Sequence, residues 1–292
     1  MGLISGLEHV VREDELLARH TWLRLGGPAE FFAEPTTVDE LATLVKRCRE
    51  QEITVRLMGG GSNLLVPEAG VQGVVVHLAT PAFVNISVDG QRVVAGGGAR
   101  LTHVLSSAAR EGLAGLESLA GIPGTVGGAL HNNSGRPHAD IGQCTSAATV
   151  MTRAGDIIRR DRNDLQFAYR QSSLNELVIL EGEFELESED PVELTKRMQK
   201  LWIVAKANHP GDDQNSGRVF KNPHGVRAAD LIEQLGLKGH RVGRAVLSER
   251  HANFVVADPG CGTQDVLDLI ELVRIRVSDE LGIELENEID VW

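Results

Sequence analysis

The sequence predicts a mixed fold of the α+β or α/β class. Segments that alternate like strands are interleaved with segments whose apolar residues recur at helical spacing. Three glycine-rich stretches, at 59–63, 96–98 and 121–129, stand at junctions between such segments and indicate ligand-binding loops. The 292 residues are enough for two or three domains, and 42% hydrophobic with 24% charged residues is an ordinary globular composition.

Helices and strands alternate in the first half of the chain. A helix is expected over 36–50, because Thr37 and Glu40 have the spacing of a capping box. Asp89 and Gly90 form a type I′ turn signal and predict a hairpin between the segments on either side. The remaining elements expected here are strands at 53–57, 73–78, 84–88 and 92–95 and a helix at 101–111.

Strand-like segments dominate the next part of the chain, between 145 and 187, and a helix is expected over 190–205. The composition of 209–217 is that of a loop and marks a domain boundary. Beyond it the sequence predicts a helix ending at Gly236, a strand at 252–257, an amphipathic helix at 265–281 and, from the alternation in 283–291, a half-buried strand.

Charge and composition exclude several classes of function. A net charge of −12, from 29 Lys and Arg against 41 Asp and Glu, argues against nucleic-acid binding through a wide basic face. The 3 cysteines do not have the spacing of a disulfide framework or a zinc site, so we expect no bound metal. The sequence has neither an apolar run near the ~18 residues of a membrane span nor a signal peptide. We therefore expect a cytoplasmic protein that acts on small molecules, without nucleic-acid or membrane partners.

The first long glycine-rich stretch directly follows a predicted strand. Its backbone amides can form a nest for an anion, although a tight glycine turn explains this stretch alone equally well. It lacks the G-x-G-x-x-G spacing of a dinucleotide fingerprint and the lysine of a P-loop. The residues that we assign to a ligand here are Gly59, Gly60, Gly61, Ser62 and Asn63.

The second stretch, 121–129, is more specific, because four glycines and a proline within nine residues cannot form a regular element. Together with the first stretch it predicts a loop around a diphosphate, held by backbone amides. The residues assigned to this loop are Gly121, Pro123, Gly124, Thr125, Gly127 and Gly128.

Several further motifs follow one another along the chain. They are Thr21–Ala29, the Tyr-Arg-x-Ser motif within Phe167–Ser172, Val219–Pro223, Ser248–Phe254 and Gly282–Glu288. With these motifs and the two glycine-rich stretches, the chain resembles the UDP-N-acetylenolpyruvoylglucosamine reductase family nearly from end to end. The chain is short for the subclass with an extra tyrosine loop, so it is more similar to the loop-less subclass.

The resemblance implies an α+β architecture with a vanillyl-alcohol-oxidase/PCMH-type FAD-binding fold. Two FAD-binding subdomains would span 1–72 and 73–205, and a smaller α+β domain at 206–292 would bind a UDP-sugar. FAD would be the bound cofactor and NADPH the reducing substrate. The implied reaction converts UDP-N-acetylglucosamine enolpyruvate to UDP-N-acetylmuramate in peptidoglycan precursor synthesis. We expect the protein to be a monomer or a weak dimer.

Two alternatives stay open. One is a different oxidoreductase with the same FAD fold, such as an alcohol or lactone oxidase. The other is a UDP-sugar-binding homologue with weakened catalysis, which Arg218 suggests because the family usually has a serine at that position.

The resemblance also implies roles for individual residues. Arg170 would bind the substrate carboxylate through a bidentate contact, and Lys206 would help to hold that carboxylate. From the residues alone, Arg170 would be a surface residue and Lys206 a solvated lysine at a helix end. Lys221 and Asn222 are further substrate-binding candidates.

Protonation of the substrate is the step at which this sequence departs from the family. Arg218 cannot be a practical proton donor, since the pKa of its guanidinium exceeds ~12, but it can stabilise developing negative charge. The proton would then come from water, from Ser216 or from a protonated Glu288, which is the acid that the resemblance places near the nascent carbanion.

Overall fold

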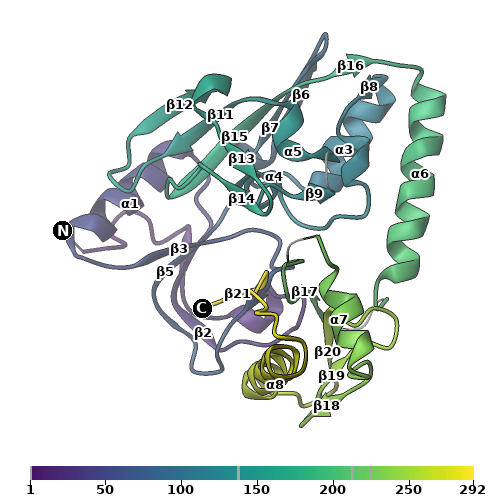
Figure 1. The fold of residues 1–292 in the computed structure, drawn as a ribbon. Coiled ribbons are helices and arrows are strands. Elements are labelled where there is room, and N and C mark those ends of the chain that lie inside the picture. The colour runs from purple at the N-terminus through teal and green to yellow at the C-terminus, as the bar shows by residue number, and fades with distance from the viewer. Residues whose placement is uncertain (1, 137–138, 212–213, 224) are drawn as a thin grey trace. The chain divides into compact units, whose positions relative to one another are not determined.

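The computed structural model describes residues 2–136, 139–211, 214–223 and 225–292 (Figure 1). The chain forms two units, each assembled from three separate segments. The first unit comprises Met1–Asp14, Glu30–Gly60 and Gln72–Ala205, and the second comprises Glu15–Ala29, Gly61–Val71 and Lys206–Trp292. The predicted division at 72 and 205 into three domains stays a prediction, and residues 15–29 and 61–71 belong with the C-terminal segment.

A four-stranded sheet with the order β1-β2-β5-β3 lies mostly in the first unit. Its strands are β1 (Val11–Leu16), β2 (Pro28–Ala33), β3 (Val55–Met58) and β5 (Val71–His77). Helix α1 (Val38–Glu50) joins β2 to β3 and places Leu41, Leu44 and Val45 in a core shared with Val74 and Val76 of β5. The predicted capping box at Thr37 and Glu40 is confirmed.

An antiparallel five-stranded sheet, β12-β11-β15-β7-β6, forms the centre of the first unit. Helices α3 (Leu101–Arg110) and α4 (Val126–His131) contact β6 and β15 respectively and share one apolar core with the sheet. The expected hairpin is present as β6 and β7. The strands are β6 (Ile86–Asp89), β7 (Arg92–Gly96), β11 (Thr145–Met151), β12 (Ile157–Asp161) and β15 (Val178–Glu185).

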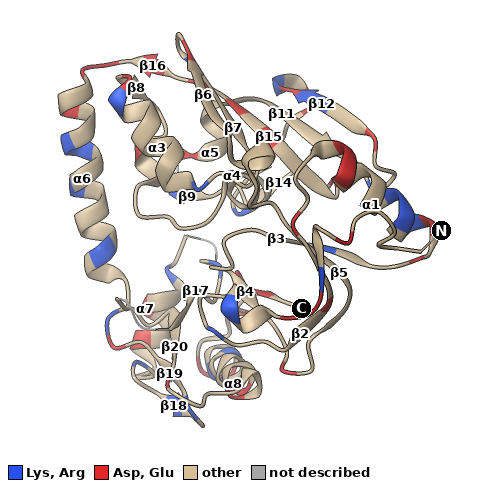
Figure 2. Cartoon of the chain, turned by 180° about the vertical axis from the view of Figure 1, so that it is seen from behind, with Lys and Arg blue, Asp and Glu red and all other residues tan. Residues whose placement is uncertain are grey.

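Short elements and the long helix α6 complete the first unit. Helix α6 (Pro191–Asn208) continues into the first residues of the second unit, and Figure 2 shows Lys and Arg residues along its length. The short elements are α2 (Pro81–Val84), β8 (Leu113–Ala114), η2 (Glu117–Leu119), β9 (Gly135–Arg136), β10 (Ala139–Asp140), α5 (Ile141–Cys144), η3 (Arg162–Asp164), β13 (Phe167–Ala168), β14 (Gln171–Ser172) and β16 (Glu187–Ser188). Among the described residues, no helix has the length and apolar character needed to cross a bilayer.

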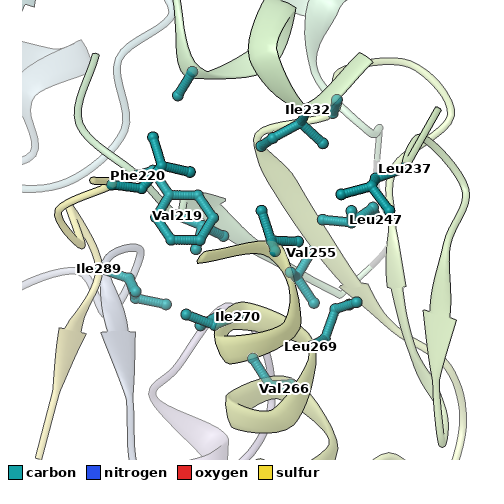
Figure 3. Packing of buried hydrophobic residues seen from close by; sticks show 14 of the residues in the cluster. Val219, Phe220, Ile232, Leu237, Leu247, Val255, Val266, Leu269, Ile270 and Ile289 are labelled. Atoms are coloured by element: carbon teal, nitrogen blue, oxygen red, sulfur yellow. The ribbon is translucent and has the colours of Figure 1, made fainter. Parts of the chain in front are cut away.

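The second unit is built on the antiparallel sheet β17-β20-β19-β18. Val266, Leu269 and Ile270 of helix α8 share one apolar core with the sheet residues Leu247 and Val255 (Figure 3). The unit's elements are η1 (Leu17–Arg19), β4 (Leu64–Leu65), β17 (Asn215–Arg218), α7 (Ala228–Gln234), β18 (Arg241–Val242), β19 (Ala245–Leu247), β20 (Phe254–Ala257), α8 (Thr263–Leu281) and β21 (Asp290–Val291).

Two predictions for the second unit were wrong in part. Residues 215–217 of the expected loop belong to β17, which ends at Arg218, while residues 212 and 213 lie outside the described residues. In the segment 283–291 only Asp290–Val291 is a strand, although Leu285 and Ile289 are buried and Glu284 and Glu286 are exposed. The alternation of apolar and acidic residues predicted burial correctly. The amides of Glu288 and Ile289, however, bond to the Val219 carbonyl in the irregular segment 219–221, so no regular ladder of strand hydrogen bonds forms.

Glu40 is held at the start of α1 by several donors. Its carboxylate accepts hydrogen bonds from Thr36 Oγ1 at 2.8 Å, from the Thr36 amide at 2.7 Å and from the Thr37 amide at 3.1 Å. These hydrogen bonds, with that of the Thr36 hydroxyl as the largest cause, lower the pKa of Glu40 from 4.5 to about 2.

We expect Glu40→Gln to lower the free energy of unfolding at neutral pH. Because the pKa is lower in the folded state, the contribution of ionised Glu40 is complete above pH 4.5 and is lost as the pH falls toward 2. The difference from the parent chain in urea unfolding should therefore shrink below pH 4.5. Glu50→Gln, at the exposed end of the same helix, is the control. A difference that is independent of pH would contradict this assignment.

Candidate active site

Gly59 and Gly60 of the first predicted diphosphate loop lie against the second loop within the first unit. A Cβ atom at Gly60 would lie 3.2 Å from the Gly124 Cα, and a Cβ atom at Gly59 would lie 2.8 Å from Thr125 Oγ1. Gly124 also has a φ of +109°, which a residue with a side chain rarely adopts. Glycine therefore allows the backbones of the two loops to approach each other closely.

The third glycine-rich stretch, at 96–98, supports the same loop. The amide of Gly127 donates to the Gly97 carbonyl at 2.7 Å, and the amide of Val126 donates to the Ala99 carbonyl at 2.9 Å. Thr125 caps α4 by accepting a hydrogen bond from the Gly128 amide at 3.4 Å. These amides hold the loops together, so the cofactor contacts expected at Gly127 and Gly128 stay a prediction.

The hairpin of β13 and β14 carries Arg170 and is tied to the end of α4. Arg170 Nη1 donates to the Gly135 carbonyl at 3.0 Å, and Ser172 Oγ donates to the His131 carbonyl at 3.0 Å. The buried side chain of Asn133 donates to the Ala168 carbonyl at 2.8 Å. The Tyr-Arg-x-Ser motif and the second glycine-rich motif therefore form one structure in this unit.

Arg170 is half-buried and has a φ of +55°, in the left-handed region that disfavours residues with a side chain. Such a conformation costs of order 1–3 kcal/mol and persists where the surroundings fix it. The hairpin thus holds Arg170 in a defined place, in contrast to the surface arginine expected without the resemblance.

Three predicted segments lie together in the second unit. Asn63 Nδ2 donates to the Glu288 carbonyl at 2.8 Å, and the Glu288 amide donates to the Val219 carbonyl at 2.7 Å. The Lys221 amide donates to the Glu286 carbonyl at 2.9 Å. A Cβ atom at Gly217 would lie 2.7 Å from the Ser62 carbonyl oxygen. The loop 61–63, the segment 217–221 and the segment 286–288 are thus neighbours.

The side chains of this cluster differ in their surroundings. Arg218 is exposed at the end of β17, and Lys221 pairs with Glu286 through an Nζ–Oε2 distance of 3.2 Å. Asn222 Oδ1 accepts a hydrogen bond from the Ala228 amide at 3.0 Å, where α7 begins. Glu288 is half-buried, whereas its neighbour Glu286 is exposed.

The remaining predicted residues are placed as follows. Lys206 is exposed near the end of α6, in the second unit, whereas Arg170 belongs to the first. Ser216 is buried, and its hydroxyl donates to the Gly217 carbonyl at 2.8 Å while accepting from the Val255 amide at 3.0 Å. Since its one hydrogen is already donated within the protein, Ser216 is a poor choice among the three proton sources considered.

An imidazole and aromatic cluster beside Arg218 was missed by sequence reasoning. The ring centroids of His251 and Phe254 are 4.9 Å apart, and those of His209 and Phe254 are 5.3 Å apart. Burial, followed by the positive charge of Arg218, lowers the pKa of His251 below its ordinary value. His251 is therefore neutral near pH 7. The only signal in the sequence is its place within the motif Ser248–Phe254.

Comparisons with known proteins cover both units. Residues 209–292 match the family described as UDP-N-acetylenolpyruvoylglucosamine reductase, C-terminal domain, and residues 29–161 match the family described as FAD binding domain. The UDP-N-acetylenolpyruvoylglucosamine reductase of Rhodopirellula baltica is 38% identical over 286 residues, which are 98% of this chain and 94% of that protein.

Solved structures agree with the sequence matches. The crystal structure of the UDP-N-acetylenolpyruvylglucosamine reductase from Thermus caldophilus has a TM-score of 0.82 at 35% identity, covering 97% of this chain and 99% of that one. A Phl p 4 variant, a glucose oxidase, has a TM-score of 0.50 at 16% identity, covering 65% of this chain and 44% of that one. The second likeness shows the fold alone. The predicted fold class, an FAD-binding oxidase-type fold followed by a C-terminal domain, is confirmed.

Gly128 offers a direct test of cofactor contact. Among the described residues, a Cβ atom at Gly128 would come within 4 Å only of Thr125 Oγ1, at the ordinary contact distance of 3.7 Å. We expect Gly128→Ala to leave the apoprotein at least as stable, since alanine favours a helix by up to ~1 kcal/mol over glycine. If the cofactor lies against this residue, the Kd for FAD should rise at least ~10-fold, equivalent to ~1.4 kcal/mol.

The two effects are measured separately, by thermal unfolding of the apoprotein and by fluorescence titration with FAD. Gly2→Ala adds the same methyl group where nothing lies within 4 Å and serves as the control. An unchanged Kd for FAD in Gly128→Ala would remove Gly128 from the cofactor site.

Proposed function

The chain belongs to the UDP-N-acetylenolpyruvoylglucosamine reductase family, and on this premise we propose that it uses NADPH and bound FAD to convert UDP-N-acetylglucosamine enolpyruvate to UDP-N-acetylmuramate. This reaction belongs to peptidoglycan precursor synthesis. The observation that carries the proposal is the match to relatives over 97–98% of the chain, including the C-terminal domain. The likeness to the Phl p 4 variant covers 65% of the chain, so a different oxidoreductase is less well supported.

The residues present fit an FAD diphosphate. Gly59 and Gly60 pack directly against Gly124 and Thr125, while a Cβ atom at Gly128 would meet only Thr125 Oγ1, at 3.7 Å among the described residues, so space for a ligand remains beside Gly128. When bound, FAD supplies to the substrate the hydride that NADPH delivers. Gly61, Ser62, Asn63, Gly121, Pro123, Gly127 and Gly128 complete the proposed cofactor site.

The proposed substrate site is cationic. Arg170 binds the substrate carboxylate with its planar fork, and Lys206 helps to hold that carboxylate. Lys221 and Asn222 bind other polar groups of the substrate. Arg218 acts as a fixed positive charge for the carboxylate as it gains negative charge after hydride transfer. Glu288, or a water that it holds, delivers the proton, since a half-buried carboxyl near an anionic substrate retains its proton more readily.

A catalytically weakened UDP-sugar-binding homologue is the second candidate, and Arg218 in the place of the usual serine is the observation that favours it. The purified protein should be yellow and release FAD on denaturation. Anaerobic reduction with NADPH, followed by addition of the enolpyruvyl substrate, distinguishes the candidates: the enzyme is reoxidised and forms UDP-N-acetylmuramate, whereas the weakened homologue only binds the substrate.

We place the reaction in the cytoplasm because it consumes NADPH and a nucleotide sugar, and we propose that the chain is a monomer or weak dimer. Sedimentation across a range of protein concentrations tests the oligomeric state, since a weak dimer dissociates on dilution.

Arg170→Lys should reduce kcat by at least ~10²-fold, because the variant keeps the charge but loses the bidentate geometry. FAD content should be unchanged. Steady-state kinetics give the comparison, and Arg162→Lys, the same substitution at an exposed position in a nearby 3₁₀ turn, is the control. A parent-like kcat in Arg170→Lys would show that Arg170 does not bind the substrate carboxylate.

Arg218→Ala should slow the reaction of the reduced enzyme with substrate at least ~10-fold and leave reduction by NADPH nearly unchanged, since only the former reaction develops negative charge on the substrate. Arg218→Ser should recover part of the rate, and Glu288→Gln should be slower than Arg218→Ala because it removes the proposed proton source. Stopped-flow absorbance separates the two reactions, with Arg274→Ala, whose side chain on α8 is 42% exposed, as the control. A parent-like rate with substrate in Arg218→Ala would place Arg218 outside the reaction.

A further inference from the structure

Asn253 is a buried polar residue beside the apolar core of the second unit, and its exposed fraction is only 1%. Its Oδ1 accepts a hydrogen bond from the Phe220 amide at 2.9 Å, and its Nδ2 donates to the Phe220 carbonyl at 2.8 Å. Its own carbonyl accepts from the Val219 amide at 3.0 Å. The side chain therefore satisfies both backbone polar groups of Phe220, as a neighbouring strand would.

The contacts between Asn253 and Phe220 lie just beyond the point where the strands β17 and β20 stop pairing. Strands β17 and β20 are paired as far as Arg218 and Phe254. Beyond that point the segment 219–221 follows an irregular path, and on its other side the Lys221 amide bonds to the Glu286 carbonyl. Asn253 thus supplies, from the β20 side, the hydrogen bonds that a regular ladder would otherwise provide.

Phe220 cannot obtain these hydrogen bonds from water. Its exposed fraction is 1%, and Figure 3 shows its ring beside Val219 in the core of the unit. A buried amide and carbonyl without partners are strongly unfavourable, so the Phe220 peptide groups remain where Asn253 places them. Arg218 and Lys221 stand immediately on either side of the Val219–Phe220 pair.

We propose that Asn253 is a positioning residue for the substrate, because its contacts with Phe220 fix the backbone from which Arg218 and Lys221 present their cationic groups. The inference rests on the proposed function, in which both side chains face an anionic nucleotide sugar. Asn253 itself touches neither the substrate nor the cofactor in this proposal. Its effect is transmitted through one short, buried segment of backbone.

The test compares Asn253→Asp and Asn253→Ala with the parent chain. The aspartate variant is nearly isosteric and still accepts from the Phe220 amide, but once its carboxyl is ionised it has no hydrogen to donate to the Phe220 carbonyl. The alanine variant removes both hydrogen bonds and keeps the test available if the buried carboxylate prevents folding. Leu269→Ala, a core substitution on α8 in the same unit, is a control for general loss of stability.

Three measurements are made on each folded protein. Stopped-flow absorbance should show reaction of the reduced enzyme with substrate slowed at least ~10-fold in the Asn253 variants, since small displacements of positioning groups cost up to ~10²-fold, with reduction by NADPH unchanged. Calorimetry should show a higher Kd for UDP-N-acetylmuramate. Hydrogen exchange should become faster at the amides of 219–221. In Leu269→Ala, the rates and the Kd should match those of the parent chain.

The outcomes separate the two claims. If the parent chain neither binds the product nor reacts with the substrate, the proposed function fails, and exchange at 219–221 still reports whether Asn253 fixes this segment. Unchanged exchange there, a parent-like rate with substrate in an Asn253 variant, or an equal loss in Leu269→Ala would each overturn the positioning role.

Discussion

The carbonyl oxygen of Val219 accepts hydrogen bonds from two successive amides, those of Glu288 at 2.7 Å and Ile289 at 3.3 Å. Val219 is fully buried, so its peptide groups cannot exchange these partners for water. The segment that contains Arg218 and Lys221 is thereby fixed to the segment that contains Glu288. The candidate site of the second unit depends on this shared backbone, because its charged side chains extend from positions directly adjacent to it.

Close approach of backbones is the corresponding constraint in the first unit. Gly59 and Gly60 contact Gly124 and Thr125 with no room for side chains, and Gly127 packs against Gly97. Glycine is therefore required there by the protein's own packing, before any ligand is considered. The glycine-rich composition predicted a ligand loop for a sound reason, but most of these glycines are explained equally by contact between the loops, and Gly128 is the exception.

Periodic elements were predictable because their signals are local. The spacing of Thr37 and Glu40 fixed the start of α1, and the Asp89–Gly90 turn fixed the hairpin of β6 and β7. Local patterns report which side of a segment is buried but not which partner its amides find. This is why the alternation at 283–291 predicted the burial of Leu285 and Ile289 correctly and the strand incorrectly. The contacts of Asn253 could not be predicted for a related reason, because its side chain bonds to the backbone of Phe220, 33 residues away in the sequence.

The composition of the second unit has a consequence for how the chain is made. Leu23 and Leu65 lie in the same core as residues of α8, and β4 pairs in parallel with β21, at the last residues of the chain. During synthesis the N-terminal segments of this unit must wait, without their core, until residues 206–292 have left the ribosome. Such long-range closure is slow. A fragment limited to residues 206–292 would lack both leucines and the strand that pairs with β21. The family match at 209–292 therefore covers only part of the second structural unit.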